Sequence, residues 1–449
     1  MAYVITQNCC KDASCVAACP VNCIHPVPDE EGFAAQPMLY VDPRVCIDCG
    51  ACADACPVDA VVPADELGPA EQVYADLNAE HFAQLPLQPA ATPVTTPARP
   101  TFREWDRPTF DWSLPSDFGG LDVAVVGTGP AGMYAAEHLL LHTRSRVTLY
   151  DRLPVPGGLV RWGVAPDHPG TKRIGRTFAR LHDHPRLRLR LGVEVGRDVT
   201  TAGLAARHDA VVYAVGAAEG RRLGVPGEDL PGSLTAPEVV GWYNDHPEAD
   251  PDLVRLDHER AVVVGTGNVA LDVARVLTAD PDALAATSAA AYAVRALREG
   301  RLREVVVLGR RGEEHAAWTR PERLALDHLP EQRIRFRFHA SIARILGEER
   351  VSGVELTDGT RIDAGLVVTS IGYLGHPVPG LPFDAETRRV PHDAGRVRGL
   401  PGAYVVGWAK RGARGGIGDN RADAAETIRT LLQDAVGGMR GVGPGTAAV

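Results

Sequence analysis

The stretch Leu121–Asp151, LDVAVVGTGPAGMYAAEHLLLHTRSRVTLYD, decides the fold of a large part of this chain. Its first six residues are a β-branched run that predicts a buried strand, and an apolar run over 133–142 predicts a helix. A second β-branched run over 147–150 predicts another strand, which ends at Asp151. Between the first strand and the helix stands GTGPAG, so the order of elements is that of a dinucleotide-binding βαβ unit.

Each glycine of this loop has a physical reason to be there. Gly127 permits the tight turn, Gly129 lets the backbone approach a pyrophosphate, and Gly132 allows the helix to pack closely on the strand. The helix N-terminus offers free N–H groups and the positive end of its dipole to phosphates. Asp151 can accept hydrogen bonds from a ribose diol. We therefore predict a dinucleotide site here rather than an ordinary glycine-rich loop.

Length and composition set broad limits. The chain has 449 residues, 45% of them hydrophobic, which is ordinary for a globular protein of several domains. No run approaches the roughly 18 uncharged apolar residues of a membrane-spanning helix. The N-terminus lacks the basic and apolar regions of a signal peptide. We expect a cytoplasmic protein with no membrane span.

Charge is unevenly distributed. Residues 1–70 carry ten acidic and two basic residues, a net charge of −8, whereas the whole chain carries −10, so the remaining residues sum to −2. This balance argues against nucleic acid as a partner and suits docking of an acidic module onto a local basic surface. On charge alone, solvated acidic loops are an equally good interpretation.

The nine cysteines all lie between Cys9 and Cys56, which indicates a local metal site rather than a disulfide scaffold. The second of two runs has the spacing C-x2-C-x2-C-x3-C-P of bacterial ferredoxins, from Cys46 to Pro57. The first run reads C-x2-D-x2-C-x3-C-P on the same template, with Asp12 in place of its second cysteine. Zinc sites use paired C-x2-C knuckles instead, so zinc is the weaker interpretation.

In the ferredoxin pattern the fourth cysteine of each run binds the cluster of the other run. This exchange predicts one [4Fe–4S] cluster on Cys19, Cys46, Cys49 and Cys52. It predicts a second cluster on Cys9, Cys15 and Cys56, with Asp12 at the fourth corner. A carboxylate holds iron less firmly than a thiolate, so the second cluster is expected to be [3Fe–4S] or a labile, Asp-ligated [4Fe–4S]. Cys10 is an alternative to Cys9, and Cys23 is left over.

The N-terminal stretch resembles the dicluster bacterial ferredoxins over residues 1–65, and the resemblance implies a small α+β domain of two similar halves. Prolines punctuate residues 71–118, which we interpret as a semi-extended linker. Such a tether would raise the effective concentration of the module at its docking site to about millimolar. We assign residues 1–70 to the ferredoxin domain.

A second fingerprint follows over 261–277: strand, G-x-G-x-x-A with Gly265 and Gly267, then helix. The next strand candidate, 304–308, is followed not by an acid but by Arg310 and Arg311. Paired guanidinium groups bind a 2′-phosphate, which an acid would repel. The first site, with Asp151, therefore suits FAD, and the second suits NADP(H). A solvated surface pair is the alternative for the two arginines.

Several segments resemble the adrenodoxin-reductase family, the NADPH–ferredoxin reductases among two-dinucleotide flavoproteins. They are LVRWGVAPDHP at 159–169, GWYNDHP at 241–247, GNVALDVARVL at 267–277, GRRG at 309–312, and the segment 407–418. The resemblance covers residues 120–435, and with the module in front the chain resembles fused ferredoxin/ferredoxin–NADP reductases. It implies an α/β fold with two Rossmann-like three-layer domains: an FAD domain at 119–225 and 365–449, and an NADP domain at 226–364.

The resemblance also assigns site residues. The FAD contacts would be Ala131, Gly132, Asp151, Leu159, Trp408, Gly415, Gly416 and Ile417. The NADP contacts would be Gly267, Asn268, Arg310, Arg311 and Glu322, with Gly415 near the nicotinamide. His168 and Asp272 match positions that assist proton handling near the flavin. The chain departs from the family in having Asp151 where Glu is common, and Gly157-Gly158 where an aromatic is usual.

The function implied is transfer of a hydride from NADPH to FAD, then of single electrons to the clusters and to an external ferredoxin or other one-electron acceptor. The partners are thus NADPH and that acceptor, with the module docked on the reductase within the chain. The alternative is an electron-relay subunit of a larger complex, like the small subunit of glutamate synthase. A flavin disulfide reductase is excluded, because no cysteine follows Cys56.

Overall fold

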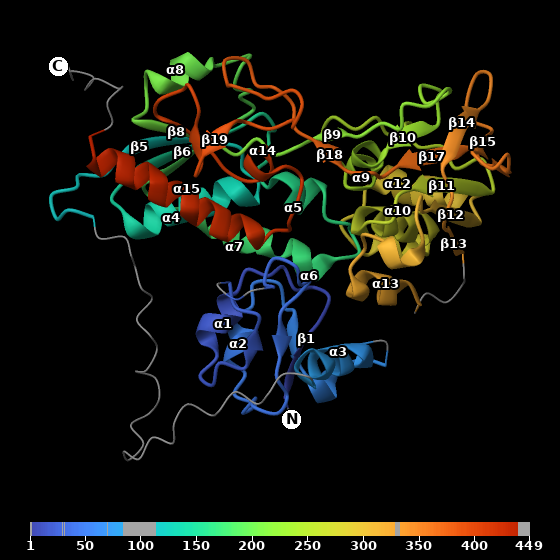
Figure 1. Ribbon diagram of the computed structural model, residues 1–449, viewed down its shortest axis with the longest axis horizontal. Helices are drawn as coiled ribbons and strands as arrows, with labels where there is room; N and C mark the ends of the chain where they lie inside the picture. The colour runs from blue at the N-terminus through green and yellow to red at the C-terminus, as the bar shows by residue number, and fades with distance from the viewer. Residues whose placement is uncertain are drawn as a thin grey trace.

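The computed structural model describes residues 2–28, 30, 32–69, 71–83, 114–327 and 333–438. Figure 1 shows a small N-terminal module, in blue, beneath two larger α/β units that stand side by side. The predicted fold class is confirmed: two Rossmann-like domains follow a small α+β domain. No helix among these described ranges is long and apolar enough to cross a membrane.

The N-terminal module is built from two similar halves. Antiparallel pairs join β1 (Tyr3–Ile5) to β4 (Val61–Pro63) and β2 (Ile24–His25) to β3 (Tyr40–Val41). Each cysteine run leads into a short helix, which is α1 (Ser14–Ala18) in the first half and α2 (Ala51–Ala55) in the second. Strands this short bury little apolar area, so the module depends on other contacts for its stability.

One such contact is the helix α3 (Gln72–Ala83), which lies where the linker was expected to begin. Its buried residue Asn78 accepts hydrogen bonds from the N–H groups of Ile5 (3.2 Å) and Val41 (2.7 Å) and donates one to the carbonyl of Ile5 (2.9 Å). The helix therefore joins both halves of the module. A polar residue at the centre of the buried face hides the helical pattern of the sequence. The remainder of the expected linker up to residue 113 lies outside the described residues.

The first dinucleotide domain has a seven-stranded sheet of order β19-β20-β21-β8-β5-β6-β7, whose edge strands β19 (His392–Asp393) and β20 (Arg396–Val397) are antiparallel. Its parallel centre consists of β21 (Ala403–Val405), β8 (Ala210–Tyr213), β5 (Asp122–Val126), β6 (Arg146–Asp151) and β7 (Leu187–Leu191). Val123 and Val125 pack into one core, whereas Ala124 and Val126 pack into another, so β5 is buried on both faces. The helices α4 (Pro130–His142) and α15 (Asp419–Val436) lie side by side on one face (Figure 1).

The second dinucleotide domain has a five-stranded parallel sheet. Its order is β10 (Ser233–Thr235), β17 (Leu366–Thr369), β11 (Arg260–Val264), β12 (Glu304–Leu308) and β13 (Ile334–Arg337). The helices α9 (Ala236–Tyr243) and α10 (Asn268–Thr278) pack on one face. The small antiparallel sheet of β14 (Ile342–Leu346), β15 (Gly353–Leu356) and β16 (Arg361–Asp363) covers the other face.

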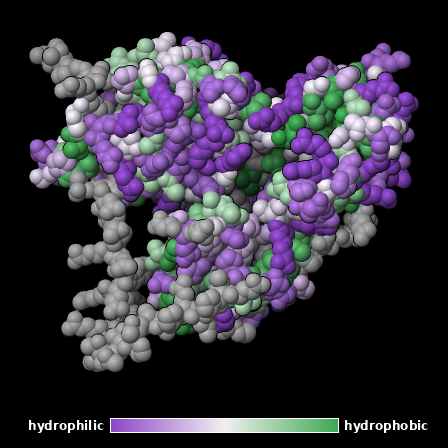
Figure 2. All heavy atoms as spheres, in the orientation of Figure 1, coloured by the Kyte–Doolittle hydropathy of each residue, from purple (hydrophilic) through white to green (hydrophobic). Residues whose placement is uncertain are grey.

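The chain passes between the two domains twice. A short antiparallel pair, β9 (Glu219–Gly220) and β18 (Tyr373–Leu374), marks both crossings (Figure 1). The return to the first domain was expected at residue 365, but β17 still belongs to the second sheet, where it pairs with β10 and β11. On the face shown in Figure 2, hydrophilic side chains cover both domains, and hydrophobic ones line the notch between them.

Candidate cofactor sites and the junction between them

The first glycine loop has the shape that a dinucleotide needs. Gly127 has φ +112°, and a Cβ added there would lie 2.3 Å from the carbonyl oxygen of Ala214. A Cβ at Gly132 would lie 2.0 Å from the carbonyl oxygen of Gly127, so only glycine lets the helix sit this close to the loop. Pro130 opens α4 and needs no partner for its nitrogen. These residues fit a bound pyrophosphate at the helix N-terminus.

Asp151 lies at the end of β6, as predicted, and holds the loop in place. Its Oδ2 accepts a hydrogen bond of 2.9 Å from the N–H of Thr128 and another from the hydroxyl of the same residue. Its Oδ1 accepts a hydrogen bond of 2.9 Å from the N–H of Leu153. The carboxylate is thus oriented toward the glycine loop, the position from which a ribose would be bound.

The other residues assigned to FAD lie in two further loops. Leu159, on α5 (Gly158–Trp162), is 36% exposed, which makes it one of the few exposed large hydrophobic side chains. Trp408 begins α14 (Trp408–Arg411) and donates a hydrogen bond of 3.1 Å from Nε1 to the carbonyl oxygen of Gly415. A Cβ added at Gly158 would lie 2.6 Å from the Cα of Gly129, so α5 meets the first glycine loop backbone to backbone. A flat ring system fits such glycine-lined, partly apolar surroundings.

The second glycine loop repeats the arrangement of the first. Gly265 has φ +125°, and a Cβ there would lie 2.1 Å from the carbonyl oxygen of Ser370. A Cβ at Gly267 would meet nothing within 4 Å, so the space in front of α10 is open. Asn268 is held by Thr319, whose N–H donates to its Oδ1 at 2.8 Å.

Arg310 and Arg311 follow β12, and both side chains are exposed. Neither guanidinium forms an ion pair with a carboxylate in the described part of the chain. Two free guanidinium groups at the end of the second strand of this fold are what a 2′-phosphate would require.

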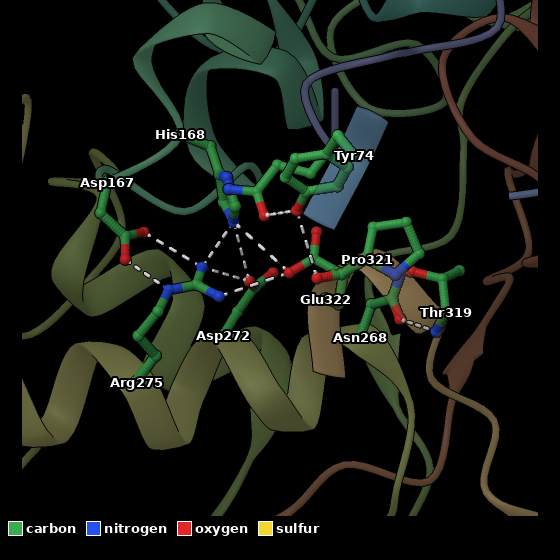
Figure 3. Close-up of polar contacts among 10 residues, drawn as sticks. Tyr74, Asp167, His168, Asn268, Asp272, Arg275, Thr319, Pro321 and Glu322 are labelled. Atoms are coloured by element: carbon green, nitrogen blue, oxygen red, sulfur yellow. Dashed lines mark hydrogen bonds and ion pairs between the residues drawn. The ribbon is translucent and has the colours of Figure 1, made fainter. Parts of the chain in front are cut away.

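His168 and Asp272 come together in a buried charged network (Figure 3). His168 Nε2 lies 3.3 Å from Asp272 Oδ1, and Arg275 Nη2 donates to the same oxygen at 2.6 Å. Arg275 also donates from Nε to Asp167 at 2.5 Å and from Nη1 to Glu322 at 3.3 Å. Asp167 and Arg275 were not predicted as site residues, although the position of Arg275 three residues after Asp272 on a predicted helix was a usable signal.

The network shifts the pKa values of its members in different directions. Burial alone would raise the pKa of Asp272, but the hydrogen bond from His168 and the charge of Arg275 outweigh burial and lower it. Burial would lower the pKa of His168, but its hydrogen bond to Asp272 and the nearby acids raise it against the opposing charge of Arg275. Burial, and then the charge of Asp272, raise the pKa of Glu322. The site can thus hold a proton on one member beside an ionised neighbour.

The same residues have the spacing of a metal site. One ligand atom each from His168, Asp272 and Glu322 lies within 4.8 Å of the others. The guanidinium of Arg275, however, already supplies a positive charge within hydrogen-bonding distance of Asp272 and Glu322. The geometry therefore favours proton handling over metal binding.

Each of the two predicted groups of cysteines combines thiols from both runs, and in the structure thiols of the two runs influence one another. Burial raises the pKa of Cys52 to about 11, with further contributions from the charges of Cys19 and Cys46. Burial raises the pKa of Cys15, and the next contributions come from Cys9 and Cys56. Thiols of the two runs therefore lie near one another, which the predicted exchange of ligands requires, and the charge of Cys52 also acts on Cys15.

Both groups also have N–H donors directed at sulfur, as iron–sulfur sites do. The N–H of Ala60 donates to Cys56 Sγ at 3.2 Å, and that of Cys23 donates to Cys19 Sγ at 3.4 Å. All nine cysteines are free of disulfides, and Cys49 is exposed. The donor sets fit iron–sulfur clusters.

Asp12, predicted at the fourth corner of the first group, has other partners. Its Oδ1 accepts a hydrogen bond of 3.3 Å from the N–H of Ser14, and its Oδ2 accepts one from the Ser14 hydroxyl. Arg421 Nη1, on α15, lies 3.3 Å from the same Oδ2. Asp12 lies beside the thiols, because its charge contributes to the raised pKa of Cys10, after burial as the main cause.

The chain thus has two dinucleotide-binding folds, each with a glycine loop. The second strand of the first fold ends in an acid, and the second strand of the other is followed by two arginines. This combination defines a flavoprotein reductase of the two-dinucleotide class. A family model described as pyridine nucleotide-disulphide oxidoreductase matches residues 121–408, and one described as 4Fe-4S binding domain matches residues 39–62. The chain nevertheless has no cysteine after Cys56, so its reductase domains hold no redox disulfide.

Some known proteins resemble the chain along nearly its whole length, and others resemble its reductase part. A probable ferredoxin/ferredoxin--NADP reductase of Mycobacterium tuberculosis is 45% identical over 496 residues, which cover 97% of this chain and 84% of the relative. The mitochondrial NADPH:adrenodoxin oxidoreductase of Homo sapiens is 36% identical and covers 73% of this chain and 82% of its own length. The structure of Mycobacterium tuberculosis FprA in complex with NADPH has a TM-score of 0.65 at 39% identity, covering 70% of this chain and 85% of that one. The chain belongs to the ferredoxin/ferredoxin–NADP reductase family, and the predicted family is confirmed.

Proposed function

We propose that this chain is an NADPH–ferredoxin oxidoreductase with its own iron–sulfur module. NADPH gives a hydride to bound FAD, which passes the two electrons singly to the iron–sulfur clusters and to an external ferredoxin or other one-electron acceptor, while the proton is released. One observation supports this proposal above all: the N-terminal module packs against the first dinucleotide domain. Buried residues of the module, such as Ile5 and Cys15, belong to the same apolar core as Val123, Leu139 and Ile428 of the first dinucleotide domain.

The first dinucleotide domain is the proposed FAD site. The loop of Gly127, Gly129 and Gly132 would hold the pyrophosphate, and Asp151 would bind the ribose. The remaining contacts are proposed for Ala131, Leu159, Trp408, Gly415, Gly416 and Ile417. The close approach of the backbone that the glycines allow at Gly127 and Gly132, and the exposed side chain of Leu159, support this assignment.

The second dinucleotide domain is the proposed NADP(H) site. The loop of Gly265 and Gly267 would hold the pyrophosphate, and Arg310 and Arg311 would bind the 2′-phosphate. Asn268 and Glu322 are the further proposed contacts. Asn268 directly follows Gly267 in the chain, and Glu322 lies beside Arg275 in the network of Figure 3. A relative in the same family binds NADPH in a solved complex, which supports the choice of coenzyme.

His168 and Asp272 are proposed to manage the proton that accompanies hydride transfer. His168 is 8% exposed, and its Nε2 lies 3.3 Å from Asp272 Oδ1 and 2.5 Å from Arg275 Nη2, so these two buried partners control whether Nε2 carries a proton. The hydrogen bond from His168 and then the charge of Arg275 outweigh burial and lower the pKa of Asp272, which keeps it ionised in this buried place.

The module is proposed to hold two clusters. Cys19, Cys46, Cys49 and Cys52 would bind a [4Fe–4S] cluster. Cys9 or Cys10, with Cys15 and Cys56, would bind a second cluster, either [3Fe–4S] or [4Fe–4S] with Asp12 as the fourth ligand. The two groups of neighbouring thiols support this division.

The test is NADPH-driven electron transfer by the purified chain alone. A monomer that reduces ferredoxin, or the artificial acceptors ferricyanide and cytochrome c, faster with NADPH than with NADH would support the proposal. Isolation only as a hetero-complex, with no such activity in the free chain, would contradict it and favour the relay-subunit function.

A further inference from the structure

The first cysteine loop touches the beginning of α15, and the contact is backbone to backbone. The N–H of Gly418 donates a hydrogen bond of 2.8 Å to the carbonyl oxygen of Cys10. A Cβ added at Gly418 would lie 2.1 Å from the carbonyl oxygen of Lys11 and 2.4 Å from that of Cys10. Glycine alone permits this approach. Gly418 directly follows the proposed FAD contacts Gly415–Ile417 along the chain.

Two ion pairs run in opposite directions across the same contact. Arg421 of α15 donates from Nη1 to the carbonyl oxygen of Asp12 at 3.0 Å and lies 3.3 Å from its carboxylate. Lys11 of the module places Nζ 3.9 Å from Asp419 of α15. Lys11 is only 8% exposed and also lies over the ring of Phe33, 4.7 Å from its centre. A buried lysine with these partners is fixed in one orientation.

The carboxylate of Asp12 is fully used in this contact. Its side chain is 11% exposed, and both oxygens accept hydrogen bonds from Ser14, with Oδ2 also paired to Arg421. Arg421 further donates to the Ser14 hydroxyl at 3.0 Å. A carboxylate that ligated iron would have to turn away from these donors and leave the guanidinium without its counter-ion.

The second cysteine loop is placed differently. Cys49 is exposed, and its neighbour Ile47 is 58% exposed, although Ile47 is a large apolar side chain. Cys46, Cys49 and Cys52 lie in the second cysteine run, whereas the residues that touch α15, Cys10 to Asp12, lie in the first. The module therefore presents one cysteine group to the reductase and the other to solvent.

We propose that Asp12 is an anchor between the module and α15 rather than an iron ligand. Arg421, Lys11 and Gly418 are positioning residues that hold the group of Cys9, Cys15 and Cys56 against the segment Gly415–Ile417, which is proposed to contact FAD. This group supplies three thiolates and would therefore hold a [3Fe–4S] cluster. Electrons enter the module on this side and leave it through the exposed Cys49 side. The inference rests on the proposed function, of which it specifies the internal route.

The experiment compares full-length holoprotein with the variants Asp12→Asn, Arg421→Gln and their combination. Arg396→Gln is the matched control, because Arg396 pairs with Asp434 at the far end of the same helix, at 2.6 to 2.7 Å. Three quantities are measured: the EPR spectrum of the oxidised protein, the rates of flavin and cluster reduction after rapid mixing with NADPH, and amide hydrogen exchange over residues 10–14.

The proposal predicts the same oxidised EPR spectrum in every protein. It predicts cluster reduction slowed about fivefold in both single variants, because an ion pair with one partly exposed partner contributes about this much. It predicts no further slowing in the double variant, because both changes remove the same pair. Flavin reduction is unchanged, and exchange over residues 10–14 becomes faster in all three anchor variants but not in the control.

A changed EPR spectrum in Asp12→Asn alone would make Asp12 an iron ligand and overturn the proposal. Unchanged cluster reduction together with unchanged exchange would also overturn it. If NADPH fails to reduce the clusters even in the wild type, the proposed function fails. Hydrogen exchange then still decides whether Asp12 and Arg421 form an anchor.

Discussion

Arg275 donates a hydrogen bond of 2.6 Å to Asp272, which lies one turn before it on α10. The same guanidinium reaches Asp167 of the first dinucleotide domain and Glu322 of α13 (Arg320–Asp327). One buried cation thus joins the two dinucleotide domains at the residues proposed to handle protons. Its removal would leave several acids without a counter-charge.

We expect Arg275→Met to lower the free energy of unfolding by about 3 kcal/mol, because breaking a buried ion pair strands its partners. Chemical denaturation measures this loss. Arg298→Met is the control, since Arg298 pairs with Asp282 on the surface, and its replacement is expected to cost no more than about 1 kcal/mol. Equal losses in the two variants would mean that the network does not stabilise the fold.

Lys172 gives a prediction about pH. Burial, and then the charge of Arg161, lower the pKa of Lys172 from 10.5 to about 8 in the folded protein. Its Nζ donates to Asn244 and to the carbonyl of Arg161, each at 2.8 Å. Between about pH 8 and 10.5 the unfolded chain binds more protons at this site than the folded one, so stability rises with pH across this window and is lost again as the pH falls.

The prediction is tested by urea unfolding of the wild type and Lys172→Met at a series of pH values. The difference between the two proteins in free energy of unfolding is expected to grow in favour of the wild type between pH 8 and 10.5. A difference that stays constant over this range would show that Lys172 keeps its ordinary pKa.

The arginines after β12 are tested by coenzyme preference. Arg310→Ala with Arg311→Ala is expected to raise KM for NADPH about tenfold or more, because charged hydrogen bonds to the 2′-phosphate are lost. KM for NADH, which lacks that phosphate, is expected to change little. Arg303→Ala, just before the opposite end of β12, is the control. If both coenzymes suffer equally, these residues do not bind the phosphate.

The thiolate count of the first cluster is tested by adding a cysteine. Asp12→Cys is expected to convert this cluster to a stable [4Fe–4S] form, because a thiolate at this position has no pairing with Arg421 to keep and can turn to the open corner. EPR of the oxidised and reduced variant distinguishes the two forms. An unchanged cluster type would contradict the assignment of Cys9, Cys15 and Cys56 to one site.

The hydrogen bonds of Asn78 are expected to stabilise the N-terminal module. Asn78→Leu keeps the size of the side chain but leaves the N–H groups of Ile5 and Val41 without an acceptor, at a cost of about 2 kcal/mol. Loss of cluster absorbance during a denaturant titration reports the stability of the module. Asp76→Leu, at an exposed position of the same helix, is expected to leave the midpoint unchanged.

Local patterns in the sequence predicted most of the architecture. Gly127 and Gly265 both have strongly positive φ, and a Cβ added at either would clash with a neighbouring carbonyl oxygen. The glycines of the motif are therefore required by the backbone of any such fold. The cysteine spacing is likewise determined locally, because a short loop must bring its thiolates to one cluster. These signals need no knowledge of distant contacts.

Contacts between distant residues could not be predicted in the same way. Asp12 matched the template position of a missing cysteine, but its carboxylate pairs with Arg421, which is 409 positions away. The helix α3 was missed because Asn78, a polar residue, occupies the centre of its buried face. In both cases tertiary partners, rather than local preference, determine what the residue does.

The most direct test of the account is EPR of the purified full-length protein after anaerobic addition of NADPH, together with flavin, iron and sulfide analysis. The account predicts one flavin, two clusters, and cluster signals that change to their reduced forms as the flavin is reduced by NADPH. A protein whose flavin is reduced while both clusters stay oxidised would contradict it, because the module would then not receive electrons from the reductase on which it is seated.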